Sequence, residues 1–223
     1  MCIRDRISYL DEQIGEIVKE LKALGLYKNT LIIFSSDNGP TYTGGADTPY
    51  FDSAKPFKTE YGWGKGFVHE GGIRVPMIAT WKGKIQSNSE SNHISAFYDV
   101  LPTLCEVANA PVPKNTDGIS FLPNLLGKKQ DAHKFLYWEF PAYKGQQALR
   151  MGKWKAIRRN ILEGNTTIEL YNLENDIQEQ NDVAKNHPEV IAKIEVIFKS
   201  EHRPAETEKF RMAALGDKVA KKN

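Results

Sequence analysis

An acidic side chain and an amide side chain stand next to each other directly after a short apolar run. Leu31-Ile32-Ile33-Phe34 is followed by a polar stretch that contains Asp37, Asn38 and Gly39. Carboxylate and amide oxygens are hard ligands, which suit Ca²⁺ or Mg²⁺ better than Zn²⁺. Asp-Asn-Gly is also a turn signal, and for an isolated tripeptide the turn is the more frequent outcome. The tripeptide therefore marks either a metal site or a turn.

A second feature that could do chemistry is a glycine-rich loop around Lys65. Five glycines lie within the eleven residues from Gly62 to Gly72. Glycine lets the backbone approach a ligand closely, and a lysine among glycines can present a positive charge to a tetrahedral anion. The loop lacks the Gly-Lys-Ser/Thr ending of a nucleotide-binding P-loop. The alternative is a flexible loop with an exposed lysine.

The apolar pattern predicts the elements that must position these residues. Apolar residues at three- and four-residue steps predict an amphipathic helix over residues 7–24, with Gly25 as its left-handed cap. Residues 31–34 predict a strand buried on both faces, which is typical of mostly parallel sheets covered by helices. Another strand is predicted over residues 75–81. The aromatic-rich loop over residues 40–72 lies between the two strands, and loops of this length are usually functional.

The second half of the chain has a different pattern. Asp99 is expected to cap a helix whose leucines face inward. Beyond about residue 140, a hairpin over residues 148–157 and an alternating strand over residues 167–173 indicate a small antiparallel sheet. A helix that begins at Pro188 follows.

Composition limits the class of protein. Charged residues make up 26% of the 223 residues and hydrophobic residues 40%, which is ordinary for a globular protein. The net charge of +2 comes from residues 201–223, because the rest of the chain holds 24 residues of each sign. This distribution argues against a nucleic-acid partner, which needs basic residues clustered on a folded face. No apolar run approaches the roughly 18 residues of a membrane span, so no membrane partner is expected.

Taken together, the motifs resemble the formylglycine-dependent (type I), arylsulfatase-like sulfatases of the alkaline-phosphatase-like superfamily. The matching segments occur in the family's order from about Ile7 to about residue 200. They are Tyr9 to Gly15, Asp37 to Gly39, Gly64 to Gly66, Glu70 to Pro76, Asp99 to Leu104, Asp117 to Ser120, Leu149 to Lys155 and Leu170 to Leu173.

This resemblance implies an α/β fold with two parts. Residues 7–144 would form the C-terminal half of an alkaline-phosphatase-like α/β/α domain. Residues 145–200 would form a small antiparallel sheet-and-helix subdomain, and residues 201–223 a polar tail. Residues 1–6 depart from the family pattern and are expected to be a non-native start.

The resemblance also implies roles for individual residues. Asp37 and Asn38 would be ligands of an active-site calcium ion, and Lys65 would be a catalytic residue that contacts the sulfate group. His69 would either contact substrate or be a packed histidine, and the packed histidine is the more frequent outcome. Glu70 would have a structural role, together with Arg74, in tying the glycine loop to the next strand.

The family's nucleophile is missing from the sequence. Formylglycine is made from a Cys/Ser-x-Pro-Ser-Arg motif, and neither Cys2 nor Cys105 lies in one. We therefore expect the C-terminal portion of a calcium-dependent sulfatase that acts on aryl or carbohydrate sulfate esters and is inactive alone. By the same resemblance, the intact protein would be periplasmic or secreted.

Two other functions fit the same residues. A phosphodiesterase or phosphonate hydrolase of the superfamily can share the Asp-Asn pair and the formylglycine. A non-catalytic module could retain the lysine loop to bind sulfated glycans. The loop aromatics Tyr42, Tyr50, Tyr61 and Trp63 could stack on sugar or aryl rings or pack the loop against its own domain.

Overall fold

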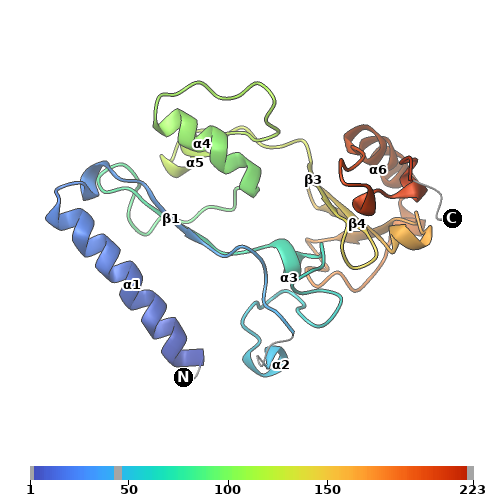
Figure 1. The fold of residues 1–223 in the computed structure, drawn as a ribbon, viewed down its shortest axis with the longest axis horizontal. Coiled ribbons are helices and arrows are strands. Elements are labelled where there is room, and N and C mark those ends of the chain that lie inside the picture. Colours follow the sequence, from blue (N-terminus) through green and yellow to red (C-terminus); the bar gives the residue numbers. More distant parts are fainter. Residues whose placement is uncertain (1–2, 43–46, 220–223) are drawn as a thin grey trace. The chain divides into compact units, whose positions relative to one another are not determined.

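The structure is a computed structural model that describes residues 3–42 and 47–219 (Figure 1). The chain divides into two compact units, which are described separately. The first unit comprises Met1–Ser35 and Met77–His133, and the second comprises Ser36–Pro76 and Lys134–Asn223. Of the expected non-native start, residues 1–2 lie outside the described residues, and residues 3–6 belong to the first helix.

The first unit contains one long helix and a two-stranded sheet. Its elements are α1 (Ile3–Ala23), β1 (Ile32–Ser35), β2 (Met77–Thr80), α4 (Val100–Val107), α5 (Leu122–Leu125) and short 3₁₀ helices over Tyr27–Asn29 and Phe97–Asp99. The predicted first helix is confirmed, and Gly25 adopts the left-handed conformation after it, with φ of 71°. The apolar stripe of α1 is only partly covered within the unit, since Ile7 and Ile17 are more than 60% exposed.

The prediction of a parallel, doubly buried strand at residues 31–34 is wrong for the described residues. β1 pairs antiparallel with β2, with Ile32 opposite Thr80 and Ser35 opposite Met77. Phe34 is 39% exposed, so β1 is half-buried. The physical reason is that β2 is the one strand paired with β1 among the described residues, and a two-stranded sheet leaves much of each strand exposed.

The second unit contains a four-stranded antiparallel meander. Its elements are α2 (Thr48–Phe51), α3 (Glu70–Ile73), β3 (Leu136–Phe140), β4 (Gln146–Met151), β5 (Trp154–Arg159), β6 (Glu169–Asn172), α6 (Pro188–Glu201) and 3₁₀ helices over Ile161–Glu163, Ala184–Asn186, Glu208–Phe210 and Ala213–Leu215. The strands are ordered β3-β4-β5-β6, so each pairs with its neighbour in sequence. The predicted hairpin, alternating strand and final helix are confirmed.

The core of the second unit lies between the meander and α6 (Figure 1). Ile194 and Phe198 of α6 pack against Leu149 of β4 and Leu170 of β6, and all four are at most 1% exposed. The sheet starts before residue 145, because β3 is its first strand. The segment after α6 is also less solvated than a polar tail, since Met212 is 2% exposed.

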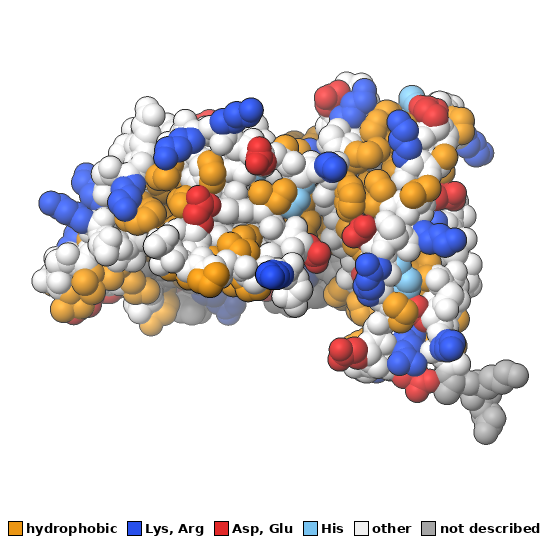
Figure 2. Space-filling model, turned by 90° about the horizontal axis from the view of Figure 1, so that it is seen from above, with side chains coloured by type: hydrophobic (Ala, Val, Ile, Leu, Met, Phe, Trp, Pro, Cys, Tyr) orange, Lys and Arg blue, Asp and Glu red, His pale blue; other side chains and the backbone are white. Residues whose placement is uncertain are grey.

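Charges of both signs are interspersed on the face drawn in Figure 2, with hydrophobic side chains between them. Within residues 3–42 and 47–219, none of the helices combines the length and apolarity that a membrane span requires.

Candidate functional site

The Asp37-Asn38 segment and the lysine loop are hydrogen-bonded to each other in the second unit. The amide of Gly39 donates to the carbonyl of Gly72 at 2.9 Å, and the amide of Lys65 donates to the carbonyl of Pro40 at 3.0 Å. The two segments that the sequence singled out for chemistry are therefore held side by side by backbone hydrogen bonds.

The glycines of this region are required by close backbone packing. A Cβ atom at Gly39 would lie 1.8 Å from the carbonyl oxygen of Gly71. A Cβ atom at Gly71 would lie 1.8 Å from the carbonyl oxygen of Lys58, and one at Gly72 would lie 2.1 Å from that of Phe67. These distances leave no room for any other residue type. The structure thus gives these three glycines a role in packing backbone against backbone.

Lys65 is presented on the surface of the loop. It stands between Gly64, which is buried, and Gly66, which has φ of 91°. Its side chain is exposed, and within the described part of the chain it has no hydrogen bond or ion pair. A free ammonium group on a backbone fixed by hydrogen bonding is suited to contact an anion.

Asp37 and Asn38 provide oxygen donors beside this loop. The side chain of Asp37 is exposed, and the Nδ2 atom of Asn38 donates to the carbonyl of Gly39 at 2.9 Å. This hydrogen bond orients the amide so that its oxygen is left as the remaining polar atom. The two oxygens suit calcium by type, although calcium takes 6–8 ligands. Among the described residues, no three His, Cys, Asp or Glu side chains come together as a metal-binding group.

His69 lies inside the second unit and away from solvent. It is 0% exposed, and its ring centroid lies 5.2 Å from that of Trp63 and 6.4 Å from that of Tyr171. Neither ring nitrogen has a hydrogen-bond partner among the described residues. Burial, followed by nearby cations of which Lys155 is the first, lowers the pKa of His69 to about 2. The ring is therefore neutral, which favours the packed histidine over the substrate contact.

A buried group of charges lies directly after His69; we call it the Glu70 cluster. The Oε1 atom of Glu70 lies 2.8 Å from the ammonium of Lys155, and its Oε2 atom lies 3.0 Å from Arg150 and 3.3 Å from Arg74. Burial alone would raise the pKa of Glu70, but these three cations hold it below its usual range. The expected contact between Glu70 and Arg74 is present, and the cluster also ties α3 to β4 and β5.

Glu179 completes the Glu70 cluster. Its Oε2 atom accepts the backbone N–H of Glu70 at 2.7 Å, and its Oε1 atom lies 4.0 Å from Lys155. Glu179 is 1% exposed, and its Oε1 atom has no hydrogen-bond partner among the described residues. Burial, with a smaller contribution from the charge of Glu70, raises the pKa of Glu179 to about 7, against the lowering effect of Lys155. Two carboxyl groups thus share one buried lysine, and one of them, Glu179, has its pKa near neutral pH.

Most of the loop aromatics pack the loop against its own unit. The ring centroids of Tyr42 and Tyr61 are 4.9 Å apart, those of Tyr61 and Phe67 are 5.2 Å apart, and those of Phe67 and Tyr143 are 5.1 Å apart. Trp63 lies beneath the ammonium of Lys58, which is 4.0 Å from the ring centroid. Tyr50 is 79% exposed, and Tyr61 remains 65% exposed despite its ring contacts.

Two family profiles match the sequence. The profile "Sulfatase" matches residues 2–110, and "N-sulphoglucosamine sulphohydrolase, C-terminal" matches residues 59–203. The second match covers more than half of the chain. The chain belongs to the sulfatase family. The residues matched by the first profile include Asp37 and Asn38, and both matched ranges include Lys65 and His69.

Curated sulfatases are similar over most of this sulfatase chain. N-acetylgalactosamine-6-O-sulfatase of Bacteroides thetaiotaomicron is 31% identical over 211 residues, which cover 88% of the chain and 41% of the relative. Arylsulfatase A of Homo sapiens is 35% identical over 157 residues, which cover 68% of the chain and 29% of the relative. The chain therefore spans less than half the length of these relatives.

Solved structures share the fold. The crystal structure of Ps i-CgsB in complex with k-i-k-neocarrahexaose matches with a TM-score of 0.69 and 30% identity, over 85% of this chain and 40% of that one. BT4656, in complex with its substrate D-glucosamine-2-N,6-O-disulfate, matches with a TM-score of 0.69 and 25% identity, over 86% and 39%. These neighbours confirm the predicted alkaline-phosphatase-like fold class.

Three members of the Glu70 cluster were not predicted from the sequence. Arg150 and Lys155 lie in a segment that resembles the family, but nothing in the local pattern distinguishes the buried Lys155 from the exposed Lys153. Glu179 lies in a polar stretch between β6 and α6, where a buried carboxylate has no local signal. The resemblance of residues 149–155 to the family was the one available signal.

Proposed function

We propose that this chain contributes the metal-ligand pair and the sulfate-binding lysine to a calcium-dependent sulfatase that hydrolyses carbohydrate sulfate esters. The observation that carries the proposal is the pairing of the 37–40 segment with the lysine loop, through the hydrogen bonds from Gly39 to Gly72 and from Lys65 to Pro40. Membership of the sulfatase family supports the reaction class. The substrate class is supported by relatives named N-acetylgalactosamine-6-O-sulfatase and ulvan-active sulfatase.

Each of these residues has a defined task in this proposal. Asp37 and Asn38 would hold calcium through side-chain oxygens, together with ligands from outside the described residues. A bound calcium ion would polarise the sulfate oxygens. Lys65 would offset negative charge on the sulfate group, and its backbone hydrogen bond to Pro40 would keep it beside the metal ligands. The Glu70 cluster would hold the loop against the meander and would not contact substrate.

A longer polypeptide is needed to test the reaction. The coding sequence of this chain, extended by the sequence upstream of it, would be expressed in a host that forms formylglycine. Release of sulfate from 4-nitrophenyl sulfate and from N-acetylgalactosamine-6-sulfate would then be measured. We expect Lys65→Ala to lower kcat about 10²–10³-fold, as removal of an electrostatic contact to the transition state does.

Lys144→Ala is the matched control, because Lys144 is also an exposed loop lysine and forms an ion pair with Glu163. We expect it to have unchanged turnover. Equal activity of Lys65→Ala and Lys144→Ala would contradict the role of Lys65. Faster cleavage of bis(4-nitrophenyl) phosphate than of either sulfate ester would instead indicate a phosphodiesterase.

The 223-residue chain by itself offers a second test. It lacks the formylglycine motif, so we expect it to release no sulfate from 4-nitrophenyl sulfate. Turnover by the purified chain that disappears in the Lys65→Ala variant would contradict this expectation. Binding of a sulfated polysaccharide that persists in EDTA, without turnover by the longer polypeptide, would favour a binding module.

A further inference from the structure

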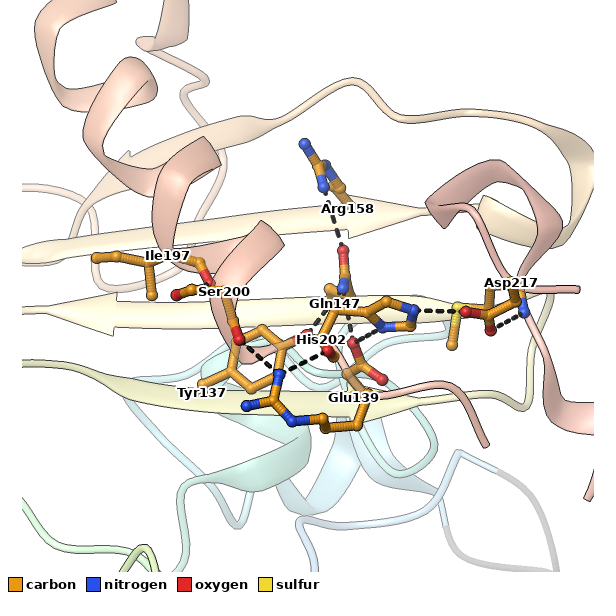
Figure 3. Close-up of polar contacts among 10 residues, drawn as sticks. Tyr137, Glu139, Gln147, Arg158, Ile197, Ser200, His202 and Asp217 are labelled. Carbon is orange, nitrogen blue, oxygen red and sulfur yellow. Dashed lines mark hydrogen bonds and ion pairs between the residues drawn. The ribbon is translucent and has the colours of Figure 1, made fainter. Parts of the chain in front are cut away.

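His202 lies between two carboxylates at the end of α6 (Figure 3). Its Nδ1 atom is 2.6 Å from the Oε1 atom of Glu139 on β3, and its Nε2 atom is 2.7 Å from the Oδ1 atom of Asp217. Glu139 belongs to the meander, whereas Asp217 belongs to residues 203–219, which we call the C-terminal segment. One imidazole ring therefore joins this segment to the sheet.

The protonation state of the ring follows from these two contacts. A neutral imidazole has a single N–H group and can donate to one carboxylate only, while its other nitrogen presents a lone pair. A lone pair facing a carboxylate at 2.6 or 2.7 Å would be repulsive. With both carboxyl groups ionised, both contacts are hydrogen bonds only when His202 is doubly protonated, and the result is a cation between two anions.

The neighbouring groups hold both carboxylates in place; together with His202 we call them the His202 cluster (Figure 3). Glu139 also accepts hydrogen bonds from the hydroxyl of Tyr137 and, at 2.8 Å, from Gln147. The second oxygen of Asp217 accepts the backbone N–H of Met212 at 2.7 Å. Neither carboxylate therefore depends on His202 for its orientation.

Two further cations contact residues of the His202 cluster. Arg158 of β5 donates to the Oε1 atom of Gln147 at 3.3 Å and is attracted by Glu195 of α6. The guanidinium of Arg203 donates to the carbonyls of Ser200 and His202. Neither cation forms an ion pair with Glu139 or Asp217 among the described residues, so His202 supplies the charge that these carboxylates face.

The C-terminal segment also makes an apolar contact within the described residues. Met212 is 2% exposed, and Ala213–Leu215 packs near Ile161–Glu163. Arg211 donates to the carbonyls of Ala205 and Lys218, which are both within the segment. The ring of His202 thus adds an ionic attachment to the apolar one.

We propose that His202 is a pH-sensitive clasp, which fixes the C-terminal segment to β3 while the ring is doubly protonated and loosens the segment as the pH rises. This device is independent of the sulfatase reaction, because it involves none of the residues assigned to the metal or the sulfate group.

The direction of the pH dependence follows from the balance at the ring. Burial lowers the pKa of His202, but the hydrogen bonds that the ring donates to Asp217 and Glu139 outweigh it and raise the pKa above the ordinary value of 6.5. A basic group with a raised pKa in the folded state contributes its full stabilisation below its unfolded value. The clasp is therefore closed below about pH 6.5. It opens as the pH rises through the higher value of the folded state.

The test measures protonation and attachment separately in the full 223-residue chain. Nitrogen-15 NMR at pH 6 should show both ring nitrogens of His202 protonated. Amide hydrogen exchange of residues 203–219, corrected for intrinsic rates, should be faster at pH 8.5 than at pH 6 by about tenfold, as the loss of one hydrogen bond to a charged group allows.

Variants complete the design. His202→Gln should raise exchange of the segment about tenfold at pH 6 and remove its pH dependence, since Gln carries no charge. His187→Gln is the matched control, because His187 flanks α6 at its other end and lies 3.6 Å from a single carboxylate, Glu189. This variant should leave the hydrogen exchange of the C-terminal segment and its pH dependence unchanged. A ring nitrogen without a proton at pH 6, or exchange of the segment in wild type that does not change with pH, would overturn the proposal. The wild-type measurements decide it even if His202→Gln does not fold.

Discussion

The Glu70 cluster and the His202 cluster are both groups of charges in the second unit, but they differ in their contact with water. In the Glu70 cluster, the side chain of Lys155 is 0% exposed and that of Glu70 is 3% exposed. In the His202 cluster, the side chains of His202 and Glu139 are 11% and 21% exposed. Water is therefore excluded from the contact between Glu70 and Lys155, although Arg74 at the edge of that cluster is 48% exposed. It partly screens the contact between His202 and Glu139.

This difference determines what each cluster can do. Removing one partner from a buried ion pair leaves an uncompensated charge, so the Glu70 cluster is stable only when complete. Lysine and arginine also keep their charge throughout the physiological pH range. The histidine of the other cluster changes its charge near neutral pH. Apart from Glu179, the charges of the first arrangement do not change near neutral pH, which suits lasting attachment of the lysine loop. The second arrangement is suited to attachment that depends on the charge of its histidine.

The largest effect is expected for Lys155→Met, which removes the central cation from the Glu70 cluster. Glu70 and Glu179 would remain buried, and the free energy of unfolding should fall by about 3–5 kcal/mol. Urea denaturation at pH 7 measures this loss. Lys153→Met is the control, because Lys153 is exposed and lies 4.0 Å from Glu174; it should cost about 0.5 kcal/mol or less. Similar losses for both variants would remove the distinction between buried and exposed lysines.

Glu179→Gln tests the one titrating group of the Glu70 cluster. An acid whose pKa is raised in the folded state binds more protons there than in the unfolded state, so stability falls as the pH rises from about 4.5 to about 7. The glutamine variant lacks this loss. We expect the free energy of unfolding of the variant to match that of wild type at pH 4.5 and to exceed it by about 1–3 kcal/mol at pH 8. Parallel stability curves from pH 4.5 to 8 would show that Glu179 is not a titrating group.

Tyr137→Phe tests the His202 cluster without changing its charge. The variant loses the hydroxyl that donates to Glu139 and accepts from Gln147, whereas the hydrogen bond from Gln147 to Glu139 remains. Urea denaturation should show a loss of about 1–2 kcal/mol, which is typical of two hydrogen bonds. A loss as large as that of Lys155→Met would contradict the view that this cluster is the more tolerant one.

The smallest effect is expected for Lys65→Ala, which lies outside both clusters. Its side chain is exposed and unpaired within the described residues, so the midpoint of urea denaturation should be unchanged within about 0.5 kcal/mol. The proposed loss of turnover in the longer polypeptide would then be a loss of function alone. A clear loss of stability would instead give Lys65 a structural role.

Local patterns predicted the elements better than their packing. The helix after Asp99 forms, but the side chain of Asp99 does not cap it and instead accepts the N–H groups of Ala96 and Ile119. Leu101 and Leu104 are 49% and 46% exposed, whereas Thr103 is fully buried. The hydroxyl of Thr103 donates to the carbonyl of Asp99 and accepts the N–H of Phe121, which turns this polar residue inward. The pairing partner that selects this face lies 18 residues away, so periodicity could not identify it.

The sequence identified the candidate site residues, but it did not predict the buried cluster that holds their loop. Asp37, Asn38 and Lys65 could be identified because family motifs are contiguous in sequence. The contact between Glu70 and Lys155 joins residues 85 positions apart, and no local signal marks a lysine that will be buried. The roles of Asp37, Asn38 and Lys65 in metal and sulfate binding stay predictions.

The strand connectivity implies an order of folding. The meander pairs strands that are consecutive in the chain, with only residues 152–153 between β4 and β5. The pairing of β1 with β2 must instead close the whole of residues 36–76, and the entropy lost on closing a loop increases with its length. Contacts between residues close in sequence form fastest. We therefore expect the meander to form first and to serve as the template on which the lysine loop, through Glu70, is ordered last.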